Sequence, residues 1–391
     1  MESQFPASRP SLAELFGAFF RLGLTAFGGP SMVAYIRKLS VEQKHWLDRE
    51  TFNHGVALCQ AIPGATAIQT TAFVGLIAGG VPGAAACFIG FGLPAFLIMV
   101  AFAAVYTYTS NLPAIVAAFS GLQAIIVAIV ANAAISFGKT TLTSWKRLLI
   151  AGVAALLFAL NLNPALIILL AALGGFLLLS AEPPAGGKPL APFPVQPTGR
   201  AVIGILLAAA LGFGLLFVFQ RNRFELAALF FRIDLLAFGG GFSSLPLMYR
   251  EVVDVRGWMD SATFLNGIAL GQVTPGPIVI TATFVGYILH GLWGAILATI
   301  GIFLPSFTLV VGITPYFNRL RSFASFNKVI AGILCSFVGL LVAVTLRFAG
   351  DVHWSVVHLL LASAALLALL RKVDILWVVL AGIAISVILI R

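Results

Sequence analysis

The stretch FFRLGLTAFGGP at residues 19–30 returns, little changed, as FFRIDLLAFGGG at residues 230–241. The two copies start 211 residues apart (230 − 19), and nearly the same spacing joins the Pro-Gly dipeptide at 63–64 to the one at 275–276. Uncommon residues that match in the same order are not a by-product of an apolar composition. We therefore interpret the chain as two similar halves joined in tandem.

The composition places both halves in a membrane. Of the 391 residues, 60% are hydrophobic and only 9% are charged, whereas about 25% are charged in an ordinary globular protein. Long apolar runs with so few charges predict an all-α polytopic integral membrane protein in contact with the lipid bilayer. The net charge of +10 would suggest nucleic acid in a soluble chain. Here we attribute it to cytoplasmic loops and expect no nucleic-acid partner.

The order of apolar and polar stretches divides the chain into four parts. Residues 1–180 contain the first repeat, and residues 220–391 contain the second. Between them, residues 181–200 are rich in proline and glycine and nearly free of charge, which predicts a linker. Residues 201–219 form one extra apolar segment, long enough for a transmembrane helix. A single extra crossing would place the second repeat upside down relative to the first.

Basic residues in matching loops support this inverted arrangement. The first half has a basic loop at 139–147, and its counterpart at 349–353 has neither lysine nor arginine. Conversely, the second half has a basic loop at 317–328, and its counterpart at 107–112 has none. Because lysine and arginine mark the cytoplasmic side, the alternation predicts two inverted structural repeats.

Proline and glycine interrupt the apolar segments at matching places. The Pro-Gly dipeptides lie inside the apolar stretches 52–78 and 262–289, and glycine runs occur at 28–30 and 239–241. A broken helix in lipid must have its freed backbone groups surrounded by protein or by a watery cavity. We therefore expect both stretches to be broken and re-entrant, with the four breaks meeting near the membrane midplane. Helix N-termini there can hold an anion, and the alternative is simple kinks with close helix packing.

Polar residues beside the breaks are candidate ligands for that anion. Gln60 and Gln272, which match in the repeat, offer neutral donors, or else bond within the helix bundle. Arg21 and Arg232 also match, and a guanidinium suits an oxyanion, although such side chains can snorkel to the interface. Asp234 has no acidic counterpart and either pairs with Arg232, the option we favour, or serves in ion coupling. The predicted substrate-binding set is Arg21, Gly28, Gly29, Gln60, Pro63, Gly64, Arg232, Gly239, Gly240, Gln272, Pro275 and Gly276.

Other residues with chemical potential do not form recognisable sites. The three cysteines and five histidines show no spacing typical of a metal or redox motif. The sequence also lacks a phosphate-binding GxxxxGK[ST] loop and any Ser/His, HExxH or paired-Asp arrangement at membrane depth. We therefore expect no enzyme, no catalytic residue, no metal, no cofactor and no ATP-driven pump. The matched Asp48 and Asp260 precede helices and are interpreted as structural caps.

With these motifs in place, the chain resembles the long, two-domain form of the chromate ion transporter family. The resemblance rests on Phe27-Gly28-Gly29-Pro30 with Phe238-Gly239-Gly240-Gly241, on Gln60 and Pro63-Gly64 with Gln272 and Pro275-Gly276-Pro277, and on Leu93-Pro94 with Leu304-Pro305. It implies a multi-pass protein of the cell inner membrane that exports chromate and confers chromate resistance. The resemblance also implies that the membrane potential or a proton gradient drives export.

The sequence departs from the family pattern at two positions. Two other functions and the oligomeric state stay open. Ala65 stands where the first Pro-Gly-Pro would be completed, and Gly241 replaces the proline of the second glycine motif, so the two half-sites need not be equivalent. A carrier for the uptake of sulfate or another oxyanion, tolerating chromate, is the alternative function. An intramembrane enzyme or scaffold is a third option, but a scaffold would not need matched helix breaks. A homodimer is one option for the assembly.

Overall fold

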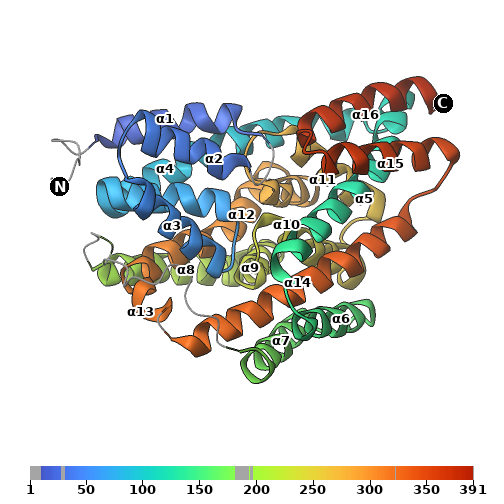
Figure 1. Ribbon diagram of the computed structural model, residues 1–391. Coiled ribbons are helices and arrows are strands. Elements are labelled where there is room, and N and C mark those ends of the chain that lie inside the picture. Colours follow the sequence, from blue (N-terminus) through green and yellow to red (C-terminus); the bar gives the residue numbers. More distant parts are fainter. Residues whose placement is uncertain (1–9, 28–30, 181–192, 194–196, 322, 391) are drawn as a thin grey trace. The chain divides into compact units, whose positions relative to one another are not determined.

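The computed structural model confirms an all-helical chain. It describes residues 10–27, 31–180, 193, 197–321 and 323–390, and within these ranges the regular secondary structure is helical (Figure 1). The glycine run at 28–30 and most of the predicted linker at 181–200 lie outside the described residues.

The first repeat is a series of helices of very unequal length. Its elements are α1 (Leu12–Thr25), α2 (Ser31–Arg37), the π-helix η1 (Lys38–Gln43), α3 (Arg49–Ala61), α4 (Thr66–Thr109), α5 (Pro113–Thr141), α6 (Trp145–Ala159) and α7 (Pro164–Leu178). Helix α8 (Gly199–Phe219) then follows.

The second repeat reproduces that order. Its elements are α9 (Arg221–Leu236), α10 (Gly241–Tyr249), the π-helix η2 (Arg250–Val255), α11 (Ser261–Val273), η3 (Ile278–Ile280), α12 (Thr281–Ile313), η4 (Thr314–Tyr316), α13 (Phe317–Arg321), α14 (Ala324–Asp351), α15 (Val356–Leu370) and α16 (Ile375–Leu389). Even the six-residue π-helix recurs, 212 residues later (250 − 38). π-Helices are rare, so their recurrence confirms the internal repeat. Asp48 and Asp260 accept hydrogen bonds from the first turns of α3 and α11, as expected for caps.

The longest helices, α4 and α12, each reverse direction near their first third. In α4, Gly80 has φ +65°, and a Cβ atom added to Gly75 would lie 2.3 Å from the carbonyl oxygen of Gly83. Residues eight apart (83 − 75) in a straight helix are about 12 Å apart. The matching pair in α12, Gly286 and Gly294, shows the same 2.3 Å approach. Each long helix is therefore a hairpin of two helical arms.

The first Pro-Gly dipeptide lies at the tip of another hairpin. A Cβ atom on Gly55 of α3 would lie 2.1 Å from the ring of Phe73 in α4, so α3 and the first arm of α4 pack against each other. Neither α3 nor the arm at 66–78 reaches the roughly 20 residues of a straight membrane span. The stretch 52–78 is thus re-entrant, as predicted. The second stretch, 262–289, is likewise broken at Pro275-Gly276, between α11 and η3.

Tertiary contacts divide the chain into two compact units, and each unit contains parts of both repeats. The first unit comprises Met1–Val100, Gly187–Gly241 and Thr274–Leu320. In it α9 packs against α12, and α1 packs against the second arm of α4. The second unit comprises Ala101–Gly186, Phe242–Val273 and Arg321–Arg391. There α14 packs against α5, α6 and α7, and both α15 and α16 pack against α5.

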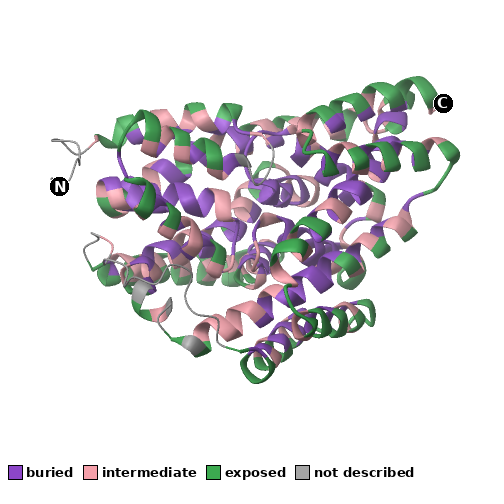
Figure 2. Cartoon of the chain, viewed as in Figure 1, coloured by how far each residue is buried: buried purple, intermediate pink, exposed green. Residues whose placement is uncertain are grey.

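The outward faces of the helices are suited to lipid. Within the described residues, five helices are long and apolar enough to cross a membrane. None of the 21 residues of α8 is buried, and exposed residues run along α16 (Figure 2), where they include Trp377 and Ile388. So much exposed apolar surface is unstable in water and is covered by acyl chains in a bilayer. The protein is therefore a multi-pass membrane protein.

Candidate functional site

The two Pro-Gly tips of the first unit contact helix ends of the opposite repeat in a reciprocal way. The N–H of Gly64 donates to the carbonyl of Ala237 at 2.8 Å, and the N–H of Gly276 donates to the carbonyl of Ala26 at 2.9 Å. Ala26 and Ala237 end α1 and α9 at matching positions, 211 residues apart (237 − 26). Equivalent contacts exchanged in this way indicate a twofold relation between the repeats. Each Pro-Gly tip thus contacts the helix end that precedes the glycine run of the opposite repeat.

Both tips require glycine. Gly64 has φ +117° and Gly276 has φ +103°, a region that side chains with a Cβ atom rarely adopt. A Cβ atom on Gly64 would lie 2.0 Å from Ser306 Oγ, and one on Gly276 would lie 2.8 Å from Ala95 Cβ. Ser306 and Ala95 occupy the same repeat position, directly after the Leu-Pro dipeptides. The close approach is therefore also reciprocal.

A buried hydrogen-bonded chain starts at the first tip. Gln69 Nε2 donates to the carbonyl of Pro63 at 2.5 Å and lies 3.4 Å from Ser306 Oγ. Ser306 donates both its N–H and its hydroxyl to Oδ2 of Asp234, each at 2.8 Å. Pro305 lies inside α12 just before Ser306, and it contributes no N–H to the backbone hydrogen bonds of the helix. The chain thus joins the tip of the first repeat to a carboxylate of the second.

Two oxygen atoms of this chain have no partner among the described residues. They are Oδ1 of Asp234 and Oε1 of Gln69, and both side chains are 0% exposed. Buried polar atoms in proteins are nearly always hydrogen-bonded. The two oxygens therefore indicate a place where a proton, a water molecule or a polar ligand completes the site.

The polar chain is confined to one side of the twofold relation. Gly23 occupies the position that matches Asp234, and Ala95 occupies the one that matches Ser306. A Cβ atom on Gly23 would lie 2.5 Å from the carbonyl oxygen of Phe91, so a side chain has no room there. The departures at Ala65 and Gly241 predicted unequal half-sites, and these positions extend the inequality.

The N-terminus of α4 and the glycine run at 239–241 approach each other at the first tip. A Cβ atom on Gly241, the first residue of α10, would lie 3.8 Å from Ala65 Cβ, directly before α4. A Cβ atom on Gly240 would lie 3.4 Å from Thr66 Oγ1. The first turn of α4 carries partial positive charge from its N–H groups. The N–H of Gly64 donates to the carbonyl of Ala237, so the N–H groups in the first turn of α4 are the candidate donors to an anion.

The remaining predicted residues differ in burial. Arg21, Arg232 and Gln60 are exposed, whereas Pro275 and Gly276 are buried. Gln272 is 9% exposed and its Nε2 has no hydrogen-bond partner among the described residues. Gly28 and Gly29 lie outside those residues, and Gly239 and Gly240 adopt φ +85° and +99°. The matching glutamines thus do not share an environment.

We predicted an ion pair between Asp234 and Arg232, but the carboxylate of Asp234 accepts hydrogen bonds from Ser306 instead. Residues two apart on a helix point to different sides, so Arg232 is exposed while Asp234 is buried against Ser306. Ser306 itself was not predicted as a site residue. Its signal in the sequence was its place directly after Leu304-Pro305, opposite an alanine in the first half.

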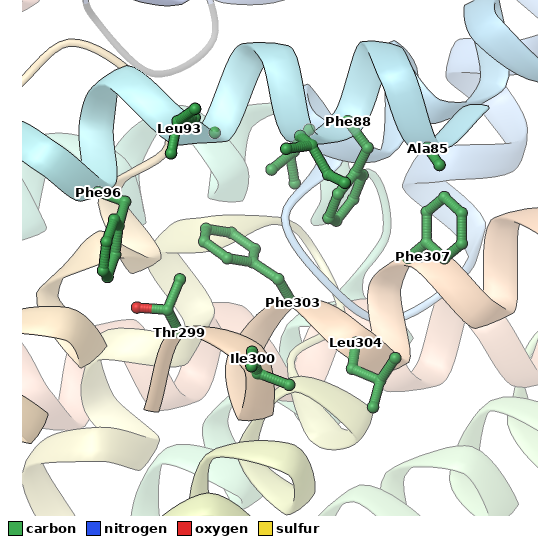
Figure 3. Close-up of a pocket in the computed structure, with 12 residues that line it drawn as sticks. Ala85, Phe88, Leu93, Phe96, Thr299, Ile300, Phe303, Leu304 and Phe307 are labelled. Atoms are coloured by element: carbon green, nitrogen blue, oxygen red, sulfur yellow. The ribbon is translucent and has the colours of Figure 1, made fainter. Parts of the chain in front are cut away.

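A cavity of about 390 Å³ lies between the second arms of α4 and α12 (Figure 3). Its lining matches across the repeat, for example Ile89 with Ile300 and Leu93 with Leu304. The hydroxyl of Thr299 is the polar group that Figure 3 shows among apolar side chains. An anion moved there from water would lose its hydration without gaining donors. The first tip is therefore a better candidate than this cavity for an oxyanion site.

Comparison with known proteins shows which family the chain is similar to. The chromate transporter family model matches residues 13–176 and 224–387. The chain is 41% identical to an uncharacterised transporter of Methanocaldococcus jannaschii over 374 residues, which cover 95% of this chain and 93% of that protein. It is 32% identical to a probable chromate transport protein of Synechococcus elongatus over 323 residues, covering 79% and 77%. It is 31% identical to a chromate transport protein of Pseudomonas aeruginosa over 356 residues, covering 87% and 81%.

No solved structure matches the chain. The family model matches it twice, once in each repeat defined above, and the two matches fit an inverted repeat. The chain therefore belongs to the chromate transporter family, in the long form with two repeats.

Proposed function

We propose that this protein is a secondary transporter that exports chromate across the cell inner membrane and thereby confers chromate resistance. Family membership and relatives named as chromate transport proteins support the substrate. The observation that carries the mechanism is the reciprocal contact of the two Pro-Gly tips with helix ends of the opposite repeat. Twofold-related repeats around one central site are the usual basis of alternating access in secondary transporters.

The proposed ligands at the first tip are neutral donors. The first turn of α4 and the hydroxyl of Thr66 supply the donors to a tetrahedral oxyanion, and the backbone of Pro63, Gly64, Gly239 and Gly240 lies beside its position. Pro275 and Gly276 mark the candidate second half-site, and Gln272 precedes them by three residues in the sequence. Neutral donors bind an anion without holding it too tightly to release.

The exposed arginines have a different role in this proposal. Arg21 and Arg232 each stand shortly before the helix end of their repeat. Exposed positive charge raises the local concentration of anions and speeds their arrival. We assign the arginines, together with exposed Gln60, to the approach to the site and not to the site itself.

The membrane potential supplies enough free energy for export. Moving one charge across 100 mV corresponds to about 2.3 kcal/mol, so a dianion leaving a negative interior gains about 4.6 kcal/mol. That free energy sustains a concentration ratio of more than about a thousandfold. Export of chromate therefore needs no ATP, in line with a transporter that is not an enzyme.

The alternative is a carrier for the uptake of sulfate or another oxyanion, tolerating chromate. The buried carboxylate of Asp234 favours it, because an anion that enters against the potential must be accompanied by protons or other cations. Sulfate and chromate share shape and charge, so the neutral donors of the site do not distinguish them.

Chromate accumulation in intact cells tests the direction. Cells expressing the wild-type chain are compared with cells expressing Gly64→Ala and with empty-vector cells, after membrane levels of the protein are matched. Export predicts lower accumulation with the wild-type chain only. Accumulation equal to the empty vector, with confirmed membrane expression, contradicts the proposal. Rescue of a sulfate-uptake mutant, with raised chromate accumulation, favours the alternative.

A further inference from the structure

Only one of the two carboxylate oxygens of Asp234 accepts hydrogen bonds within the described residues. Asp234 is 0% exposed on α9, and both donors of Ser306 converge on Oδ2. Oδ1 has no hydrogen-bond partner among the described residues. An ionised carboxylate removed from water is costly unless a proton, a cation or further donors offset its charge.

No basic group of the described structure offsets this charge. The groups that act on Asp234 are the N–H and hydroxyl of Ser306. On α9 itself, Arg232 is the titratable side chain next to Asp234 in sequence. The other helices of the first unit contribute Tyr287 and His290 on α12, Arg200 on α8 and Cys87 on α4. Arg232 and Arg200 are exposed. His290 precedes Ser306 by 16 residues (306 − 290), about 24 Å along a helix.

The carboxylate is connected to the proposed oxyanion position through one hydroxyl. Ser306 Oγ bonds Asp234 at 2.8 Å, and the same atom lies 2.0 Å from where a Cβ atom of Gly64 would be. A negative charge on Asp234 therefore repels an anion bound at the tip, because like charges in a low-dielectric interior interact strongly. A proton on Asp234 removes that repulsion.

We propose that Asp234 is the proton site linked to the oxyanion: one proton binds at Asp234 when one oxyanion binds at the Pro63-Gly64 tip. This inference rests on the oxyanion site of the proposed function and applies to export and to uptake. In export, a proton carried with the dianion leaves one net negative charge moved, which halves the free energy that the membrane potential supplies. The linkage is restricted to one proton per chain at this position, because Gly23 stands at the matching place and carries no titratable group. Proton and anion then favour each other by the same factor, as linkage requires.

The linkage has a measurable slope. For one linked proton, the apparent Kd of the oxyanion rises about tenfold per pH unit once Asp234 is mostly ionised. Asp234→Asn keeps an oxygen to accept from Ser306 but cannot ionise, so its affinity should not depend on pH in that range. Ser306→Ala removes one donor to the charged form, so the pH profile should move to higher pH. Gly204→Ala on α8, where no atom lies within 4 Å of the added Cβ, is the matched control.

The experiment measures binding of radiolabelled sulfate, which stays a dianion throughout, to the purified full chain in lipid nanodiscs across a pH series, in sodium and in choline buffers. Binding of chromate is measured at alkaline pH, where chromate carries no proton of its own. Infrared spectra of the same samples report the protonated carboxyl as the difference between wild type and Asp234→Asn. We expect the tenfold slope and the carboxyl band in wild type and in Gly204→Ala, and neither in Asp234→Asn.

Each contrary outcome is distinct. Binding that does not depend on pH in wild type, or a slope that persists in Asp234→Asn, overturns the linkage but leaves the proposed function standing. Binding that depends on sodium and not on pH overturns the proton in favour of a cation. Failure of both anions to bind at any pH overturns the linkage and the proposed function together.

Discussion

The change of Gly64 to alanine tests the geometry of the first tip. At φ +117° an alanine carries backbone strain of about 1–3 kcal/mol. Its Cβ would also lie 2.0 Å from Ser306 Oγ and 2.5 Å from Gln69 Nε2, and making room in a packed interior costs about 1–3 kcal/mol. Together the two effects amount to about 2–6 kcal/mol against the observed tip. We expect the tip to shift, and transport to fall by at least about tenfold.

The assay pairs thermal unfolding of the purified protein with chromate flux in proteoliposomes. Gly204→Ala is the control, because it makes the same chemical change on α8 with open space around the new Cβ. The control should match wild type in flux and be equally or slightly more stable, since alanine favours a helix by about 1 kcal/mol over glycine. If Gly64→Ala unfolds and transports like Gly204→Ala, the tight left-handed tip described here is refuted.

Three further predictions follow from the contacts. Gly276→Ala should act in the same direction but less strongly, because its Cβ would lie 2.8 Å from Ala95 Cβ; its unfolding temperature should fall between those of wild type and Gly64→Ala. Arg21→Gln should raise KM with little change in maximal flux, and the effect should shrink at high salt, as expected for steering. Burial raises the pKa of Asp48, but hydrogen bonds from the N–H and hydroxyl of Thr51 outweigh it and lower the pKa below its ordinary 3.8. Its stabilising effect is thus present above that pH and lost as pH falls below it, and unfolding of Asp48→Ala should show a weaker acid dependence.

Much of the architecture could be predicted because the same sequence motifs occur in both halves of the chain. The matched Pro-Gly dipeptides at 63–64 and 275–276 predicted helix breaks, and the structure has a break at each, with reciprocal contacts. Proline lacks an N–H and glycine permits a positive φ, so these residues act locally and can be interpreted locally. The aspartate caps of α3 and α11 were predictable for the same reason.

The polar chain could not be predicted, because its partners depend on packing between distant helices. Asp234 bonds Ser306, 72 residues away, whereas proximity in sequence suggested Arg232. Gln60 and Gln272 match in the repeat, yet Gln60 is exposed and Gln272 is buried. Equal positions in two repeats acquire unequal surroundings once each repeat packs against different neighbours. A sequence pattern therefore indicates where a site lies better than which side chains complete it.

Voltage-driven chromate flux is the most direct test of the central claim, that the two tips form a transport site for an oxyanion. The purified chain is reconstituted in proteoliposomes, and chromate movement is followed while a potassium gradient with valinomycin sets the voltage. We expect chromate to leave the negative compartment, at a rate that rises with voltage, with wild type and Gly204→Ala but not with Gly64→Ala. Flux absent from wild type that is folded and reconstituted, or equal in all three proteins, would contradict the central claim.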